Sequence, residues 1–556
     1  MLSIRKIGVI GRTYRNLNRY RQILGVFIKY GFGDLVDTLK IDEYIEIGLS
    51  MIQRHRRERV EKSSRAERIR MALEELGPTY IKLGQILSTR PDLIQIDLVR
   101  ELAKLQDEVP PFSFEQVQKI DEVYSSFEAT PLASASIGQV HRATLADGEV
   151  VAVKVQRPGI HKIIEVDLEI MLHLATLAER HIEELAFHQP VKIVEEFAKT
   201  LEKELDYTIE ATNIERVAQQ FLNNPTVYIP KVYKDTTTTR VLTTEYVRGI
   251  KISQVDRIDA EGYDRKLITS RGAFICLSQI FDHGFFHADP HPGNIFVLPD
   301  NVICLLDFGM VGTIDLNTRE DFVELVDSVV HRDEGRAAKY LLKITSWEEK
   351  PDMRRFEKDV ADFIGQHLFK PLKDIKLGKL MHEILELSAQ YRLLIFPDIF
   401  LMMKALSAVE TIAGSLNPDF DMVKEAAPFI RRIKLARLSP KRIHKDILQL
   451  ASRLHTFLQE FPEDLLEIMR LVKRNKLVMG HEIQGFERML NTHDQISNRL
   501  SFSIIIAALI IGSALIVISN TPPLFYGISL IGIIGFLAAA VMGVWLLVAI
   551  LKKGRL

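Results

Sequence analysis

In residues 287–312, HADPHPGNIFVLPDNVICLLDFGMVG, two of the three Asp and one of the two Asn stand at informative intervals beside Pro and Gly turns. Asp289 stands five positions before Asn294, and Asp307 follows thirteen positions after that Asn. Phosphoryl transfer concentrates negative charge on oxygen atoms, and proteins stabilise this charge with Mg²⁺ and positioned polar groups. We therefore predict that Asp307 holds a metal bridging nucleotide phosphates and that Asn294 serves a second metal. Asp289 would orient the attacking oxygen or accept its proton.

A lysine upstream fits the same chemistry. Lys154 lies in VVAVKVQ, a strand of alternating small and β-branched residues, where kinases place the lysine that contacts the α- and β-phosphates. The later Asp, Asn and Asp-Phe-Gly have the order and gaps of a kinase catalytic loop and its metal-binding segment. Each piece alone is common, because a lone Asp caps helices and a lone Lys lies on many edge strands. Together they predict a kinase-like site for ATP and Mg²⁺.

The loop expected to hold the phosphates differs from that of protein kinases. In PLASASIGQVH most glycines are replaced by Ala or Ser, whose side chains limit how closely backbone N–H groups approach a phosphate. We assign to nucleotide binding Ala133, Ser134, Ala135, Ser136, Ile137 and Gly138. No Ala-Pro-Glu segment follows residue 309, so a platform for a protein substrate is not expected.

A glutamate from the following helix should pair with Lys154. Pattern alone does not choose among the candidates in EEFAKTLEKELDYTIEATN, which are Glu195, Glu196, Glu202, Glu204 and Glu210. Further along, YIPKVYKDTTTTRVLTTEYVRG predicts a strand pair before a break at Gly249. We assign Glu245 and Val247, at the end of this pair, to nucleotide binding.

Strands and helices must position these side chains. VHRATLADGEVVAVKVQ predicts a hairpin through Asp147-Gly148, and Tyr228–Lys234 with Arg240–Val247 predicts the second strand pair. Helical periodicity dominates most of the remaining chain. The predicted fold class is α+β, a protein-kinase-like two-lobed fold with a helical N-terminal extension and a C-terminal transmembrane helix hairpin.

The C-terminal part predicts two membrane spans. From Leu500 to Leu551 there is no charged residue, and Asn520 to Pro523 divide this stretch into two halves, each long enough to cross a bilayer. Bases flank the outer ends only, so the positive-inside rule places both ends in the cytoplasm. Small residues at four-residue spacing predict close helix packing, within one chain or between the copies of a homodimer. They are Ala508, Gly512, Gly535, Ala539 and Gly543.

The distribution of basic residues and the two cysteines indicate which surfaces the protein exposes and which thiols it buries. The 556 residues carry a net charge of −1, but bases concentrate in residues 1–33, 54–70 and 426–445. We interpret the basic amphipathic N-terminal helix and the last block as surfaces for membrane lipid, and expect no nucleic acid. A helix docked on the protein fits the N-terminal pattern nearly as well, but the predicted membrane spans at the other end favour the membrane surface. Cys276 and Cys304 lie in apolar runs and are expected to be buried thiols.

Together these motifs resemble the UbiB family of atypical kinase-like proteins, which includes the ADCK proteins of mitochondria. The resemblance covers roughly residues 60–320 and rests on YIKLGQILSTRPDLI, with Lys-x-Gly-Gln from Lys82 to Gln85, and on ASASIGQVH, VAVKVQRPG, ELDYTIEATN and HADPHPGN with the later Asp-Phe-Gly. The paired C-terminal spans resemble those of the bacterial members.

The resemblance implies a kinase-like fold with an N-terminal extension folded over the active site. Lys82 and Gln85 match the extension motif near the nucleotide, which would obstruct a protein substrate. Glu204 and Glu210 match the two acidic positions of the family, and we choose Glu204 as the partner of Lys154. Family members bind adenine nucleotide with Mg²⁺, act as ATPases and support ubiquinone biosynthesis. Quinone-pathway intermediates or enzymes are therefore expected partners.

We predict an atypical kinase or ATPase, multi-pass in the cell inner membrane, with its catalytic domain in the cytoplasm. A small-molecule phosphotransferase and a non-catalytic, nucleotide-regulated lipid-handling scaffold are the alternatives. The predicted domains are a basic amphipathic region (1–65), the helical extension (66–130), an N-lobe (131–250), a C-lobe (251–430), a helical connector (431–499) and two transmembrane helices (500–551).

Overall fold

The computed structural model describes residues 17–34, 63–90, 93–105, 112, 123–182, 190–347, 350–367, 377–437, 439–440, several positions between 442 and 461, 486–519, 522–525 and 528–553. The chain divides into two compact units, Met1–His444 and Lys445–Leu556. The bases before Leu17 and those of residues 54–62 lie outside the described residues.

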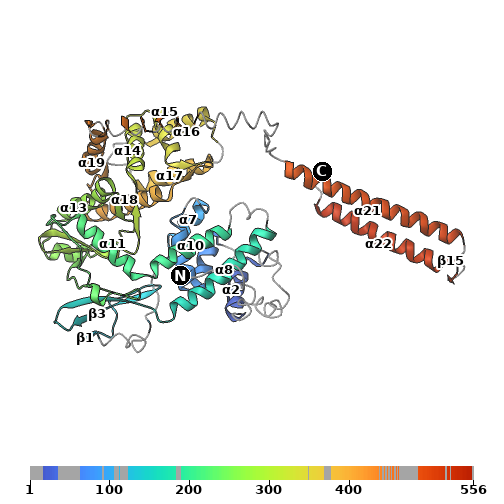
Figure 1. Ribbon diagram of the computed structural model, residues 1–556, viewed down its shortest axis with the longest axis horizontal. Coiled ribbons are helices and arrows are strands. Elements are labelled where there is room, and N and C mark those ends of the chain that lie inside the picture. Colours follow the sequence, from blue (N-terminus) through green and yellow to red (C-terminus); the bar gives the residue numbers. More distant parts are fainter. Residues whose placement is uncertain are drawn as a thin grey trace. The chain divides into compact units, whose positions relative to one another are not determined.

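A five-stranded antiparallel sheet carries Lys154 (Figure 1). Its strands, in spatial order, are β1 (Tyr124–Phe127), β3 (Gly138–Leu145), β4 (Val150–Gln156) and β6 (Val241–Glu245), with β2 (Ala133–Ser134) paired to β3. β3 and β4 form the predicted hairpin, whose turn includes Gly148 at a φ of +91°. On β4 the side chains of Val151, Val153 and Val155 enter the core, so Lys154 projects from the opposite face.

The second predicted strand pair forms only in part. β6 joins the first sheet, but β5 (Val227–Tyr228) pairs in parallel with β10 (Val302–Leu305) in another sheet, which continues through β9 (Ile295–Leu298) to β7 (Ile250–Lys251). A bridge from Val232 to Thr244 is what remains of the expected pairing. Pro230 stands between the two segments, and it has no N–H with which to continue a ladder.

Helices supply most of the remaining structure of the first unit. Before and beside the sheet lie α2 (Leu17–Lys29), α5 (Arg65–Leu76), α6 (Pro78–Leu87), α7 (Ile96–Leu102), α8 (Ile160–His181), α10 (Pro190–Glu204) and α11 (Tyr207–Gln220). After it come α12 (Val255–Ala260), α13 (Arg265–Leu277), η5 (Ser278–His283), β8 (Phe285–His287), β11 (Val311–Thr313), α14 (Leu316–Val330), α15 (Glu334–Lys343), α16 (Met353–His367), α17 (Leu377–Gln390), α18 (Pro397–Leu416) and α19 (Met422–Arg437). The fold is mixed and mostly helical, and its division into two lobes stays a prediction.

The N-terminal helix packs inside the protein. α2 buries Tyr20, Ile23 and Leu24 in the core that it shares with α5 and α8. Arg19 Nε donates to Asp167 Oδ1 at 2.7 Å, and the Asp167 side chain, on α8, is fully buried. For residues 17–29 the membrane-surface interpretation is therefore wrong, because the apolar face meets protein and not lipid.

The basic block at 426–445 is also engaged within the protein. Four charged residues of α19 and its continuation contact carboxylates: Arg432 with Asp282, Lys434 with Asp327, Arg437 with Glu324 and Arg442 with Glu320. We call Glu320, Glu324, Asp327, Arg336, Lys434, Arg437 and Arg442 the α14–α19 cluster. Carboxylates of the protein therefore neutralise four of the seven bases of this block, and Lys441 and Lys445 lie outside the described residues. The predicted contact with lipid stays a prediction.

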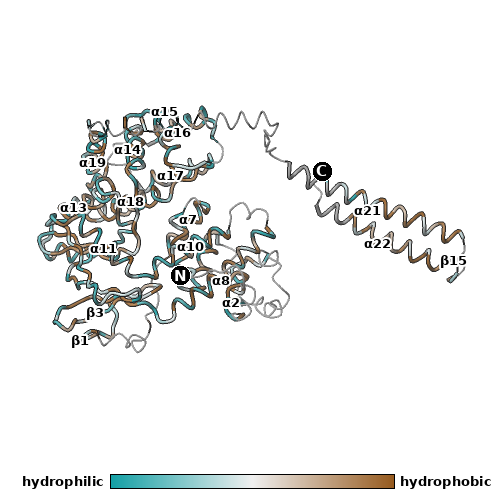
Figure 2. The backbone as a smooth tube through the Cα atoms, viewed as in Figure 1, coloured by the Kyte–Doolittle hydropathy of each residue, from teal (hydrophilic) through white to brown (hydrophobic). Residues whose placement is uncertain are grey.

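The second unit contains two helices that lie side by side, α21 (Phe486–Ile518) and α22 (Leu530–Lys553), and Figure 2 shows that hydrophobic residues predominate in both. Between them β14 (Leu524–Phe525) pairs with β15 (Ile528–Ser529). A Cβ on Gly535 would collide with Ser513, and Ala539 is buried. Small residues therefore do allow close approach within one chain, although Gly512 and Gly543 face open space.

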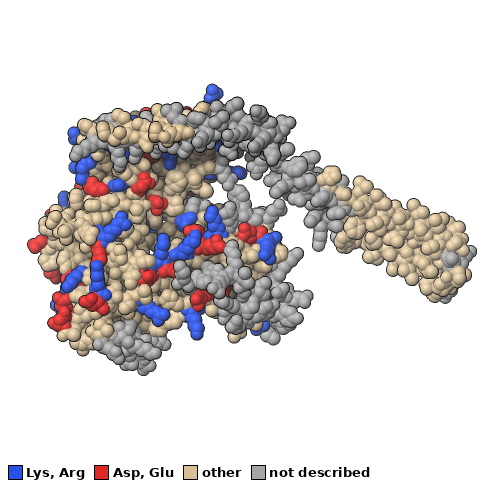
Figure 3. Space-filling view, in the orientation of Figure 1, with Lys and Arg blue, Asp and Glu red and all other residues tan. Residues whose placement is uncertain are grey.

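Within the described residues, three helices are long and apolar enough to cross a membrane: Pro397–Leu416, Arg499–Ile518 and Leu530–Leu547. Half of the first window is buried inside the protein, compared with 6% and 11% of the other two. α18 is therefore a core helix. The two C-terminal helices show no charged side chain on the face seen in Figure 3.

Candidate functional site

Lys154 lies in a group of charged side chains that three elements bring together. From β4, its Nζ donates to both carboxylate oxygens of Glu210 on α11, at 3.0 and 2.9 Å. Asp307 Oδ1 lies 3.6 Å from the same nitrogen. Beside them, Lys82 on α6 contacts Glu204 at the end of α10, with Nζ 2.9 Å from Oε2. We call these five residues the Lys154 cluster.

The choice of Glu204 as the partner of Lys154 was wrong. α10 ends at Glu204, and α11 begins three residues later at Tyr207, capped by the Asp206 side chain. The break turns the two glutamates toward different lysines, Glu210 toward β4 and Glu204 toward the N-terminal extension. Lys82 therefore reaches the cluster as the resemblance implied, through the carboxylate that we had assigned to Lys154.

Gln85, the other polar residue of the extension motif, has a structural contact. Its Nε2 donates to the main-chain oxygen of Leu105 at 3.3 Å. The glycine between the two motif residues is required by packing, because a Cβ on Gly84 would collide with Leu105. The motif thus holds α6 against the segment after α7 while Lys82 points to the cluster.

Charges in the Lys154 cluster are strongly coupled. Burial opposes the charge on Lys154, but Asp307 and Glu210 raise its pKa well above the usual value. The Lys154 ammonium in turn lowers the pKa of Asp307, whose side chain is 47% exposed. Burial raises the pKa of Glu210, and repulsion from Asp307 adds to that shift. Two ammonium groups face three carboxylates in this cluster, so it has room for another cation.

The predicted phosphate loop lies along the edge of the sheet next to this cluster. Ala133 and Ser134 form β2, Ala135 N–H donates to Gly138 O at 2.8 Å, and Ser136 and Ile137 are buried. A Cβ on Gly138 would collide with the Tyr207 hydroxyl, so this glycine permits a close approach. Within the described chain, Ser134 Oγ and Tyr207 Oη are buried without a hydrogen-bond partner.

The catalytic loop is tied to the Asp-Phe-Gly segment by main-chain bonds. Leu306 N–H donates to Asn294 O at 2.8 Å, and Ala288 N–H donates to Met310 O at 3.1 Å. His287 Nδ1 accepts from Asp289 N–H at 3.2 Å, so its Nε2–H faces Leu306 O. Burial lowers the pKa of His287, which favours this neutral form. These bonds bring Asp289, Asn294 and Asp307 to one side of the site.

Asp307 adopts an unusual backbone conformation. Its φ is +57°, in the left-handed region that non-glycine residues seldom occupy. Gly309 N–H donates to Asp307 Oδ1 at 3.2 Å, and Asn213 on α11 donates to the main-chain oxygen of the fully buried Phe308. The strand, the helix and this turn therefore fix the carboxylate toward Lys154.

Glu245 and Val247 lie where the first sheet ends. The Glu245 carboxylate accepts from the Tyr228 hydroxyl at 2.6 Å, and Val247 is half-buried in the segment between β6 and β7. Because its carboxylate is engaged, what Glu245 could offer an adenine ring is its main chain. Their assignment to nucleotide binding stays a prediction.

One charged residue at the site was not anticipated. Lys404 on α18 places its Nζ 3.1 Å from Asp289 Oδ1, although 115 positions separate the two residues. A signal existed, since Lys404 is the single base in the twenty residues of an apolar helix. Periodicity marks such a helix as core but does not show which side chain it directs to a distant loop.

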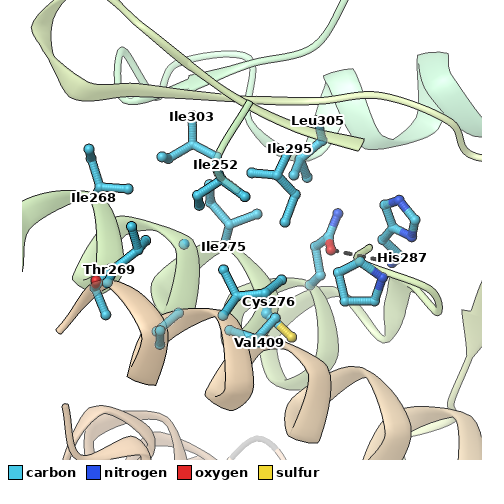
Figure 4. A pocket seen from close by; sticks show the side chains of 17 residues that line it. Ile252, Ile268, Thr269, Ile275, Cys276, His287, Ile295, Ile303, Leu305 and Val409 are labelled. Carbon is cyan, nitrogen blue, oxygen red and sulfur yellow. Dashed lines mark hydrogen bonds between the residues drawn. The ribbon is translucent and has the colours of Figure 1, made fainter. Parts of the chain in front are cut away.

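An apolar cavity of about 40 Å³ lies behind the catalytic loop (Figure 4). Its walls include His287 and Pro290 of the loop, Ile275 and Cys276 of α13, and Val409 of α18. This space would hold no more than a few water molecules and is too small for a nucleotide. Cys276 is a buried free thiol, as predicted, and burial raises its pKa to about 12.

The donor set fits magnesium and a triphosphate. No group of three or more His, Cys, Asp and Glu side chains suited to a metal occurs among the described residues. Mg²⁺ is usually bound through one or two carboxylates together with substrate phosphates and water. The ionised Asp307, the nearby Asn294 and the excess negative charge of the Lys154 cluster match that need. The unpartnered Ser134 hydroxyl beside them suits a phosphate oxygen.

Family comparisons cover most of the chain. Residues 104–341 match the ABC1 atypical kinase-like domain, residues 360–421 the UbiB helical domain, and residues 484–552 the ABC1/UbiB kinase-like C-terminal domain. The first match contains the cluster residues except Lys82, and Lys404 falls within the second.

Individual proteins similar to this chain include two curated relatives and one solved structure. A "Probable protein kinase UbiB" of Marinobacter nauticus is 36% identical over 72% of this chain and 75% of its own length. An uncharacterized protein from the hydrogenase 1 5' region of Clostridium pasteurianum is 30% identical over 97% and 99%. The structure of a complex of Rv3197 with erythromycin, from Mycobacterium tuberculosis, covers 64% of this chain and 92% of its own, at 22% identity and a TM-score of 0.44.

Proposed function

Because the chain belongs to the ABC1/UbiB family of atypical kinase-like proteins, we propose that it is a membrane-anchored ATPase or atypical kinase. It uses Mg-ATP and supports the biosynthesis of ubiquinone or a related quinone. The observation that carries the proposal is the contact of Lys154 with both Glu210 and Asp307, beside a loop that presents Asp289 and Asn294.

Each side chain has a defined task in this proposal. Lys154, oriented by Glu210, contacts the α- and β-phosphates, and the chain from Ala133 to Gly138 covers them. Asp307 and Asn294 would hold Mg²⁺, which supplies charge neutralisation at the phosphate oxygens when bound. Asp289 orients the attacking hydroxyl or water and takes its proton. In this proposal the fold has two lobes, and the nucleotide binds between them.

The acceptor is water or a small molecule in this proposal. Lys82 extends from α6 to Glu204 at the edge of the cluster, so the N-terminal extension occupies space that a protein substrate would need. The absence of an Ala-Pro-Glu segment after residue 309 agrees with this.

Membrane attachment depends on α21 and α22. Their apolar stretches Arg499–Ile518 and Leu530–Leu547 are almost entirely exposed, and we propose that they cross the inner membrane as a hairpin. The Phe502 and Trp545 rings lie 5.8 Å apart near the end that carries Arg499 and Lys552, as expected for an interfacial aromatic pair. The kinase-like unit is then cytoplasmic.

Replacing Asp307 by Asn tests the enzymatic part of the proposal. We expect Mg-dependent ATP hydrolysis by the purified full-length protein to fall about 100-fold or more, because the metal loses its charged ligand. Asp256→Asn, on the exposed start of α12, is a matched control that should keep full activity. Hydrolysis by the Asp307→Asn variant at the wild-type rate would refute this assignment.

Product analysis separates the alternatives. Free phosphate as the product indicates an ATPase, and a phosphorylated metabolite indicates a small-molecule phosphotransferase. Quinone production that survives Asp307→Asn in a strain lacking the native chain would instead favour a non-catalytic scaffold. Mass analysis of quinone intermediates in that strain gives the readout.

A further inference from the structure

α18 brings an ammonium group to the carboxylate proposed to act in phosphoryl transfer. Lys404 Nζ and Asp289 Oδ1 are 3.1 Å apart, and the two side chains are 31% and 49% exposed. Neither is sealed in the core, so a ligand can reach both. The other faces of α18 are packed inside the protein, with Ile399, Met402 and Ala405 fully buried. Lys404 is therefore not one of several charges on a solvated surface.

The catalytic loop contains no cation of its own that could take this place. Pro-His-Pro-Gly fills the interval between Asp289 and Asn294, and it contains neither Lys nor Arg. His287 is buried with both ring nitrogens in contact with main-chain groups, and Lys154 is already held by Glu210. A transferring phosphoryl group carries negative charge on three oxygens, and the Asp289 carboxylate would repel it at short range. A cation beside Asp289 removes that repulsion.

We propose that Lys404 contacts the terminal phosphoryl group of bound ATP and holds Asp289 in position for the transfer. This inference rests on the proposed function, because it requires ATP to extend from Lys154 to Asp289. An ammonium has three N–H donors, so Lys404 can keep its bond to Asp289 while it donates to a phosphate oxygen. Recognition of the third phosphate then comes from the helical region after the kinase-like domain, not from the catalytic loop.

Packing fixes α18 in the place that this role requires. Further along α18 than Lys404, the side chains of Val409 and Ile412 line the apolar cavity. His287 and Pro290 of the catalytic loop line the same cavity (Figure 4). α18 and the catalytic loop therefore lie on the same cavity, which fixes the position of one relative to the other. A long, flexible Lys side chain gains precision when its backbone is held in this way.

The test compares nucleotides that differ in the third phosphate. Affinities of the full-length protein in detergent are measured for Mg-ADP and for a non-hydrolysable Mg-ATP analogue. Lys404→Met should weaken binding of the ATP analogue about tenfold, the effect of losing one charge-assisted hydrogen bond, and leave ADP binding within about twofold. Lys404→Arg should restore most of the difference. Lys343→Met, which removes a similar 2.9 Å ion pair with Asp321 far from the loop, is the matched control.

Three results would overturn the inference. Wild-type affinity of Lys404→Met for both nucleotides shows that the lysine does not contact a phosphate. Equal weakening of both, with a lower melting temperature, shows that Lys404 only supports the fold. If the wild-type protein binds neither nucleotide, the proposed function fails, and this inference fails with it. A loss confined to the ATP analogue supports the inference.

Discussion

Two groups of charged side chains in this protein are built from the same residue types but differ in how completely they are paired. In the α14–α19 cluster three carboxylates meet four cations, and Glu324 and Asp327 each contact more than one. In the Lys154 cluster two lysines meet three carboxylates, and Asp307 is half exposed in a left-handed conformation. Every carboxylate of the first group contacts a cation and cations are in excess there, whereas the second group has more carboxylates than cations.

The difference separates a cluster whose charges join helices of the fold from one whose charges are suited to binding a ligand. Ion pairs between helices join α14, α15 and α19, and together with Arg432–Asp282 they engage four of the seven bases of residues 426–445 within the protein. Incomplete pairing beside buried, unpartnered hydroxyls of Ser134 and Tyr207 costs stability and persists at sites that bind something. The two clusters should therefore respond to mutation in opposite ways, one through activity and the other through stability.

The largest effect, on ATP turnover, is expected when each of the two glutamates of the Lys154 cluster is replaced by glutamine. Glu210→Gln leaves Lys154 without its orienting partner, so ATP turnover should fall about 100-fold. Glu204→Gln leaves the Lys154–Glu210 contact in place and should reduce turnover less than about tenfold. Steady-state phosphate release from both purified variants gives the comparison. The opposite ranking would restore Glu204 as the functional partner of Lys154.

A smaller effect, on stability alone, is expected in the α14–α19 cluster. Glu324 is largely buried and contacts Arg336 and Arg437, both about 40% exposed, so water already screens part of the interaction. Glu324→Gln should lower the free energy of unfolding by about 1–2 kcal/mol, measured by urea titration in detergent. Turnover per folded molecule should not change. A loss of activity in the folded variant would mean that this cluster also serves the site.

The smallest effect concerns acid stability. Although burial opposes its ionisation, Lys434 and nearby cations lower the pKa of Asp327 in the folded protein. A lowered folded pKa adds stability above the unfolded value, near 4, and that stability is lost as the pH falls through the folded pKa. Between pH 5 and 3 the wild type should therefore lose up to about 1 kcal/mol more than Lys434→Met.

In the Lys154 cluster the corresponding shifts oppose each other. Lys154 lowers the pKa of Asp307, whereas burial raises the pKa of Glu210, so their contributions to acid stability have opposite signs. Lys154 itself lowers the pKa of both carboxylates, so its removal shifts both in the same direction. In parallel urea titrations, Lys154→Met should therefore change the pH dependence of stability, relative to wild type, more than Lys434→Met does, because Asp327 keeps other cations nearby. Equal slopes for the two variants would remove the contrast between the clusters.

Local features were readable from the amino-acid sequence. Alternation of apolar residues and the Asp-Gly turn predicted the hairpin that carries Lys154, and the spacing of Asp289, Asn294 and Asp307 predicted a shared site. A charge-free stretch of 52 residues predicted the two apolar helices at the C-terminus. The hairpin and the two helices formed as predicted because each depends on neighbours along the chain, whose geometry backbone sterics and hydrogen bonding largely define. The shared site stays a prediction.

Pairing between distant residues was decided by tertiary structure. Lys154 is separated from Glu204 by 50 positions and from Glu210 by 56, so spacing could not select between them; the break at Leu205–Asp206 did. Packing likewise turned the basic face of α2 toward Asp167 and brought Lys404 to Asp289. Sequence periodicity determines which face of a helix is apolar, but only the packed fold determines which charge that helix meets.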